Sequence, residues 1–222
     1  MTRSGRFMIT VALVAAGLLP ASAHDVARLL NPNDREWQRT APAKFVVRLD
    51  TSQGEIVIGV ARAVAPRGAD RFYNLVRHGY YDDSRFFRVI SGRWAQFGIN
   101  GDPRIARAWR GQTMPDDPRV ESNVRGSVAF AWAERNGRTT QVFINLRDNS
   151  STLDAEGFAP FGIVTRGMDV ADSLYAGYGE ESGGGIRGGR QDPLFEGGTA
   201  FLLRQYPRLD YIRQATIDTS IP

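Results

Sequence analysis

Cysteine is absent from the 222 residues of this chain, and there are two histidines and one lysine. The lack of cysteine excludes a disulfide framework, a thiolate metal site and a cysteine nucleophile. With His24 and His78 as its histidines, the chain also has few candidates for general-base or nucleophilic catalysis. We therefore expect a fold stabilised by its core alone, and a function that requires neither a metal ion nor another cofactor.

The composition is that of an ordinary globular protein. Hydrophobic residues make up 42% of the chain and charged residues 23%, which supports one sizeable core. The formal net charge is +4, and Lys44 is the sole basic residue other than arginine and histidine. Because the arginines form no clustered stripe with interleaved aromatic residues, we expect no nucleic-acid partner.

The start of the chain has the three-part layout of a secretory signal peptide. Two early arginines are followed by an apolar run from Phe7 to Leu19 and then by small residues up to Ala23. That run is shorter than the roughly 20 apolar residues needed to span a bilayer, and no later stretch is long or apolar enough. We expect residues 1–23 to be removed by cleavage after Ala23. A periplasmic or secreted protein without stable membrane insertion is the expected product.

After this segment, the sequence divides into a polar extension and one domain. Residues 24–43 are polar and contain two prolines, which predicts an N-terminal extension with at most a short helix. Residues 44–222 form the expected domain. It begins with apolar and polar residues that alternate on both sides of a turn at 51–54, a pattern that predicts a β-hairpin.

Most of the domain is predicted to be β-structure. Helical spacing of apolar residues predicts helices at 66–79 and 167–177, and the chain ends in a predicted short helix and a strand at 212–217. Short strand-like stretches separated by turn residues favour an antiparallel sandwich or barrel over a parallel sheet. The glycine-rich stretch 177–198 follows a helix rather than a strand, so it predicts a surface loop and not a phosphate-binding motif.

Four motifs then occur in a recognisable order: FFRVISGRWAQFGINGDP at 86–103, GSVAFAWAERNGRTTQVFINL at 126–146, LDAEGFAPFGIV at 153–164 and GMDVADSLY at 167–175. In order and spacing they resemble the cyclophilin family of peptidyl-prolyl cis/trans isomerases, over about residues 44–219. The resemblance implies a mainly β fold, a closed eight-stranded antiparallel β-barrel capped by two α-helices, with the site on one outer face. It also implies an isomerase that assists protein folding, and together with the predicted signal peptide this gives a bacterial, exported member of the family. Its expected partners are proline-containing peptides or unfolded exported proteins, and the expected state is a monomer.

The resemblance also implies a set of site residues. Arg88 matches the catalytic arginine of the family, and Gln96 matches the glutamine that follows it. The residues expected to contact the substrate are Gln141, Phe143, Leu153, Trp94 and Ala133. Rotation about an X-Pro bond has a barrier of about 18–20 kcal/mol because it destroys amide resonance. A fixed guanidinium donor can stabilise the lone pair that the prolyl nitrogen regains at the twisted state, and no covalent step is required.

Two residues depart from the family pattern at the presumed site. Arg93 occupies the place of a phenylalanine of the proline pocket, and Trp132 stands where a small or polar residue is common. Arg93 could lie along the pocket with its charged head in water, or it could spoil the pocket. Two functions therefore stay open at this point: an exported proline isomerase, and a non-catalytic cyclophilin-like peptide-binding module or chaperone. A generic ligand-binding barrel of lipocalin type would leave the matches at Arg88 and Gln141 unexplained.

Overall fold

The fold is described from a computed structural model, which defines residues 23–185 and 189–218. The predicted signal peptide, apart from its last residue, lies outside the described residues. Within the described ranges, no helix is both long enough and apolar enough to cross a membrane.

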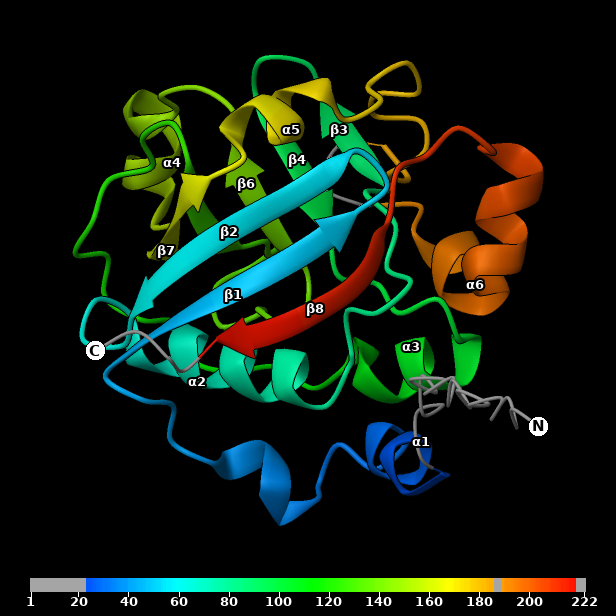
Figure 1. Ribbon diagram of the computed structural model, residues 1–222, viewed down its shortest axis with the longest axis horizontal. Coiled ribbons are helices and arrows are strands. Elements are labelled where there is room, and N and C mark those ends of the chain that lie inside the picture. Colours follow the sequence, from blue (N-terminus) through cyan, green and yellow to red (C-terminus); the bar gives the residue numbers. More distant parts are fainter. Residues whose placement is uncertain (1–22, 186–188, 219–222) are drawn as a thin grey trace, which may run out of the picture.

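The described residues build one eight-stranded antiparallel sheet that curls around the core, with helices packed about it (Figure 1). The strands are β1 (Lys44–Thr51), β2 (Gly54–Ala61), β3 (Arg88–Ile90), β4 (Trp94–Phe97), β5 (Ser127–Phe130), β6 (Val142–Asn145), β7 (Pro160–Arg166) and β8 (Ile212–Asp218). Their order across the sheet is β3-β4-β6-β5-β7-β2-β1-β8. The prediction of a mainly β, antiparallel fold is thus confirmed.

The closed barrel is where the structure differs from the prediction. The edge strands β3 and β8 form no ladder with each other, so the sheet is open and curled. An isolated antiparallel bridge between Arg85 and Tyr211 joins the segments that precede these two strands. Beside it, the Phe86 amide donates to the Asp210 carbonyl at 2.9 Å. Backbone contact between the two edges thus lies before β3 and at the start of β8, where the Ile212 amide also donates to the Ser84 carbonyl at 2.9 Å.

The predicted hairpin is present as β1 and β2, which pair along their whole length. Phe45, Val47 and Leu49 of β1 are buried, and the residues between them are more exposed. This alternation follows from the two-residue period of a strand, which sends successive side chains to opposite faces. Gly54 closes the turn with a φ of 139°, a conformation that favours glycine.

Both helices expected from apolar spacing are present. They belong to a set that comprises α1 (Ala23–Leu29), the 3-10 turn η1 (Arg35–Gln38), α2 (Pro66–Arg77), α3 (Pro103–Arg110), α4 (Ser150–Glu156), α5 (Met168–Ser173) and α6 (Asp192–Gln205). α2 buries Phe72, Leu75 and Val76 against the sheet, as predicted. α5 is shorter than the predicted 167–177 because Leu174 adopts an extended conformation, with φ −57° and ψ 135°.

The sequence does not predict α3, α4 or the start of α6. α6 begins inside the glycine-rich stretch, so the prediction of a surface loop is wrong for the last part of that stretch. Gly198 interrupts the helix with φ 53° and ψ −149°. A Cβ at Gly198 would overlap the Gly101 carbonyl oxygen, and this close approach requires glycine there. Because glycine has no apolar side chain, the glycines that permit this contact also leave the start of α6 without the helical spacing of apolar residues that would predict it.

The N-terminal extension packs against the domain. Leu29 and Ala41 are buried in the same apolar core as the strands. The indole nitrogen of Trp109 on α3 donates to the Leu29 carbonyl at 2.8 Å, and Trp37 packs edge-to-face on Trp109 at 4.6 Å between ring centres. The extension therefore shares its packing with α2 and α3.

Candidate active site

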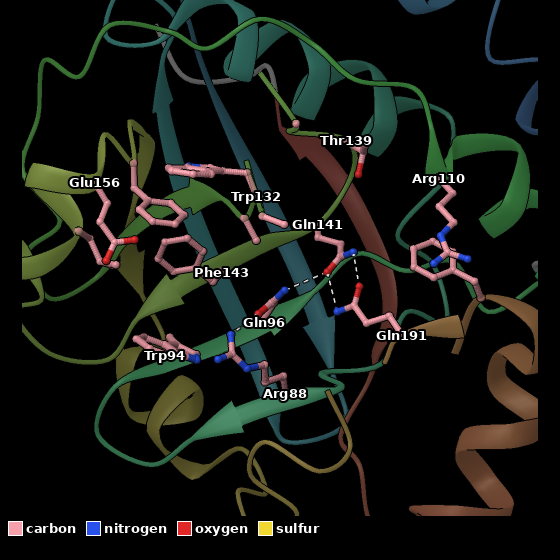
Figure 2. A pocket seen from close by; sticks show the side chains of 16 residues that line it. Arg88, Trp94, Gln96, Arg110, Trp132, Thr139, Gln141, Phe143, Glu156 and Gln191 are labelled. Atoms are coloured by element: carbon pink, nitrogen blue, oxygen red, sulfur yellow. Dashed lines mark hydrogen bonds between the residues drawn. The ribbon is translucent and has the colours of Figure 1, made fainter. Parts of the chain in front are cut away.

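A pocket of about 350 Å³ lies over β4 and β6 (Figure 2). It brings together every residue that the sequence predicts for the site except Arg93. Those lining residues are Arg88, Trp94, Gln96, Trp132, Ala133, Gln141, Phe143 and Leu153. They come from three strands, the loop between β5 and β6, and α4, so positions 65 residues apart in sequence meet in one place.

Strand geometry explains why these side chains share one face. In β4, Ala95 points into the core, whereas Trp94 and Gln96 line the pocket. Gln96 pairs in register with Arg88 of β3 on one side and with Phe143 of β6 on the other. Cross-strand partners project to the same side of a sheet, so the three side chains are neighbours on its outer face.

A continuous chain of hydrogen bonds runs along the pocket (Figure 2). Arg88 Nη1 donates to Gln96 Oε1 at 3.0 Å, and Gln96 Nε2 donates to Gln141 Oε1 at 2.9 Å. Gln141 Nε2 in turn donates to Gln191 Oε1 at 3.0 Å. Because each amide has one acceptor oxygen and one donor nitrogen, the bond to Arg88 determines the orientation of every amide along the chain. Gln96 therefore has the geometry of a residue that positions Arg88.

Arg88 is held on its other edge by Glu180. Its Nε and Nη2 atoms donate to the two carboxylate oxygens at 2.7 and 2.8 Å. The Arg88 side chain is 14% exposed, and its guanidinium lies 5.0 Å from the centre of the Trp94 ring. A buried charge without a partner would be costly, so the bidentate carboxylate explains how this cation is kept among apolar neighbours.

Beside the cation lies an aromatic pocket, formed by Trp132, Phe143 and Phe158 with Leu153 and Trp94. Trp132 stacks on Phe158 with 4.7 Å between ring centres, and Phe158 meets Phe143 edge-on at 5.6 Å. Phe143 and Leu153 belong to an apolar cluster that is separate from the main core. These two side chains therefore line the pocket on the outer face of the sheet and do not merely fill its core. Trp132, whose effect the sequence leaves open, adds a wall to the aromatic pocket.

Leu153 is presented to the pocket by the short helix α4, which neighbouring loops hold in place. Asp154 accepts hydrogen bonds from the backbone and the side-chain amide of Asn123 at 2.9 and 2.8 Å. Burial alone would raise the pKa of Asp154, but the hydrogen bonds from Asn123 and Ser122 and the nearby charge of Arg119 together outweigh it and hold that pKa below its ordinary value. The carboxylate thus stays charged and ties α4 to the chain before β5.

Sequence reasoning missed several residues of the site. It missed Glu180, which contacts Arg88, and the lining residues Phe158, Gln191, Arg110, Ala131, Gly137, Thr139, Glu156 and Phe195. Phe158 is visible in the third motif, since an aromatic residue shortly after Leu153 is well placed to share its pocket. Glu180 and Gln191 lie in the glycine-rich stretch, where neither periodicity nor motif marks them. A carboxylate among glycines is usually solvated, so the sequence carries no signal for their role.

Arg93, whose effect the sequence also leaves open, is not among the residues that line the pocket. It is exposed in the turn between β3 and β4, and its guanidinium lies 4.6 Å from the centre of the Trp94 ring. Arg93 thus contacts the lining residue Trp94 without lining the pocket itself.

We expect Arg93→Ala to leave kcat and KM for a proline peptide within about twofold of the wild-type values, because Arg93 is not itself a lining residue and its exposed contact with the Trp94 ring contributes little. The measurement is isomer exchange with a neutral and an acidic X-Pro peptide, each at low and high salt. A several-fold rise in KM for the acidic peptide that disappears at high salt would contradict this prediction and return Arg93 to the binding surface.

Arg88 and the aromatic residues of this pocket favour binding and charge stabilisation, and Glu156 and Thr139 also line it. Its lining, as far as the chain is described, contains no histidine, cysteine or serine. Across residues 23–185 and 189–218, no three side chains of histidine, cysteine, aspartate or glutamate are grouped so that they could hold a metal ion. What the pocket offers is an apolar site beside a fixed cationic donor.

An antiparallel sheet that carries an aromatic pocket and an adjacent arginine on its outer face defines a cyclophilin-like protein. Residues 46–185 match the family of cyclophilin type peptidyl-prolyl cis-trans isomerases. This chain belongs to that family.

Curated relatives support the same assignment. The chain is 35% identical over 139 residues to peptidyl-prolyl cis-trans isomerase cyp18 of Streptomyces antibioticus, a match that covers 58% of this chain and 81% of that protein. It is 32% identical over 169 residues to a peptidyl-prolyl cis-trans isomerase of Acinetobacter baylyi, which covers 74% of this chain and 80% of the relative. Its homologues are peptidyl-prolyl cis-trans isomerases.

Solved structures agree on the fold. A cyclophilin type isomerase of Cryptosporidium parvum superposes with a TM-score of 0.59 at 16% identity, covering 80% of this chain and 99% of the other. The cyclophilin AquaCyp293 from Hirschia baltica gives a TM-score of 0.58 at 18% identity, covering 83% and 77%. At these identities the likeness concerns the fold alone.

Proposed function

We propose that this chain catalyses cis/trans isomerisation of X-Pro bonds in exported polypeptides. The observation that carries the proposal is the placement of Arg88, a guanidinium fixed on two sides at the border of an aromatic pocket. The structure of a cyclophilin type isomerase from Cryptosporidium parvum was solved in the presence of the dipeptide Ala-Pro, which agrees with the binding of proline-containing peptides by this family.

The proline ring enters the aromatic pocket in this mechanism. Phe143, Phe158 and Leu153 offer apolar surface to the pyrrolidine ring, and Trp132 covers it from one side. Burial of the ring is favourable by about 25 cal/mol for each Å² of apolar surface removed from water. With the ring held, the chain on the other side of the X-Pro bond is left to turn.

Arg88 supplies the differential stabilisation. As the peptide twists, the prolyl nitrogen loses its resonance with the carbonyl and regains a lone pair. A guanidinium N–H that is already in place donates to that nitrogen more strongly than to either planar form, so the barrier falls. The partly buried setting strengthens this interaction relative to water, because charges are less screened there.

Gln141 orients the substrate backbone. Its amide is fixed between Gln96 and Gln191 in the hydrogen-bond chain, and it lines the pocket next to Phe143. One of its two amide N–H groups is committed to Gln191, so the other is available to a peptide carbonyl. This contact sets the register of the peptide against Arg88.

The direct test is NMR exchange spectroscopy on a short X-Pro peptide with the purified chain. Catalysis accelerates interconversion of the cis and trans signals at substoichiometric protein. Peptide binding without acceleration would identify the alternative, a cyclophilin-like binding module or chaperone. Absence of both binding and acceleration would reject both functions.

We expect the exported form of the protein to begin at His24, because positive, apolar and small-residue segments follow one another in residues 1–23. Unfolded polypeptides outside the cytoplasm are then its substrates, and it acts as a monomer. Mass spectrometry of the exported form decides the first point. An intact Met1, or a product retained in the membrane fraction, would overturn the proposed export.

A further inference from the structure

The glycine-rich segment, defined here as residues 178–185 and 189–191, lies directly against Arg88. Glu180 provides the two carboxylate contacts described above, and Gly183 packs on the aliphatic stem of the same arginine. Gln191, at the other end of the segment, donates to the Gly183 carbonyl and to Gln141 at 3.3 Å each. The segment therefore contacts both ends of the hydrogen-bond chain in the site.

Glu180 contacts Arg88 from outside the pocket. It is absent from the pocket lining, and its side chain is 38% exposed. Of the five N–H groups of the guanidinium, two bind Glu180 and one binds Gln96, which leaves two for a substrate. A bidentate carboxylate fixes the plane of the guanidinium as well as its position, which a single hydrogen bond cannot do.

Gly183 restricts the stem of Arg88 by close approach. A Cβ at this position would lie 2.7 Å from Cβ, Cγ and Cδ of Arg88, which is closer than carbon atoms pack. The buried glycine lets the backbone of the segment press on the arginine stem, so a larger residue would displace it. Head and stem of Arg88 are thus held by two residues of the same short segment.

We propose that Glu180 is a positioning residue for Arg88, and that the glycine-rich segment holds the guanidinium in the orientation that stabilises the twisted X-Pro bond. The proposal rests on the proposed isomerase function. A flexible arginine would lose entropy each time it met the twisted peptide, whereas a pre-fixed one is already in place. Loss of the Glu180 contacts therefore lowers kcat. KM stays near the wild-type value, because the apolar contacts that determine it are unchanged.

The test compares Glu180→Gln with Glu181→Gln in the full chain. Both remove one negative charge from the same segment, but Glu181 is exposed and, among the described residues, Arg88 takes its carboxylate contacts from Glu180. We expect Glu180→Gln to lower kcat about fivefold with KM within about twofold, and Glu181→Gln to leave both unchanged. An unchanged kcat in Glu180→Gln would reject the proposal, and a raised kcat would make the segment autoinhibitory instead.

Gly183→Ala tests positioning separately from charge. It keeps Glu180 and the net charge but moves the arginine stem, so kcat is expected to fall here as well while KM stays near the wild-type value. Wild-type kcat in both Gly183→Ala and Glu180→Gln would show that the segment has no influence on the guanidinium. Thermal unfolding of each variant shows whether it is folded at the assay temperature.

A readout without substrate separates this proposal from the proposed function. The Arg88 Nε–H signal in NMR, assigned by its loss in Arg88→Lys, is expected to exchange slowly with water in the wild type and faster in Glu180→Gln. An inactive wild-type protein would reject the isomerase function. Equal exchange rates in the wild type and Glu180→Gln would reject the positioning role of Glu180, whether or not the protein is active.

Discussion

Replacing Arg88 with alanine is expected to lower kcat/KM for a proline peptide at least about tenfold, which corresponds to about 1.4 kcal/mol of barrier. The loss should appear in kcat, because the guanidinium interacts more strongly with the twisted peptide than with either planar isomer. Exchange spectroscopy at saturating and limiting peptide concentrations separates the two constants. Wild-type exchange rates in Arg88→Ala would mean that another group stabilises the twisted state.

The stability of Arg88→Ala should change little. The carboxylate left behind, Glu180, is 38% exposed and can be solvated, so no charge is stranded in the core. Arg88→Lys is an informative companion, because an ammonium group cannot form the planar bidentate pair and is expected to remain impaired. Arg93→Ala, five positions away and outside the pocket, is the matched control for the loss of one arginine.

Trp109→Ala should have the largest effect on stability, about 3–5 kcal/mol, as is typical for the loss of a buried tryptophan. Trp109 is 2% exposed and packs edge-on against Trp37 and Tyr80. Its indole also donates to Leu29, so the substitution removes the link between α3 and the N-terminal extension as well as core volume. For a domain of this size, we expect the melting temperature to fall by about 10 °C.

Urea denaturation followed by circular dichroism measures this loss. Arg107→Ala, on the exposed side of the same helix, is the control and should change the free energy of unfolding by less than about 0.5 kcal/mol. A cost below about 1 kcal/mol for Trp109→Ala would show that the extension and α3 do not belong to the cooperative core. That result would agree with a separate extension at residues 24–43.

The sequence determined those features of the protein that depend on local pattern. Alternation along β1 decides which of its residues enter the core and which face outward, since the period of a strand is two. On β4 and β6 the same period places Ala95 and Ile144 in the core, and Gln96 and Phe143 in the pocket. The same alternation is what allows Arg88, Gln96 and Phe143 to share one surface. They could be identified as site residues from motifs in a fixed order. This works because each of them lies on a regular strand, and the spacing of residues along a strand is the same in every protein with this fold.

The tertiary structure decided the rest, because the remaining features depend on contacts between distant segments. Glu180 and Arg88 are 92 positions apart, and the segment that carries Glu180 has neither helical nor strand periodicity. In the same way, Gln191 of the same segment meets Gln141, which is 50 positions away in the sequence. A local sequence pattern indicates on which face of a strand a side chain lies. A charged side chain is stable in a partly buried pocket only where another segment of the chain places a partner of opposite charge beside it.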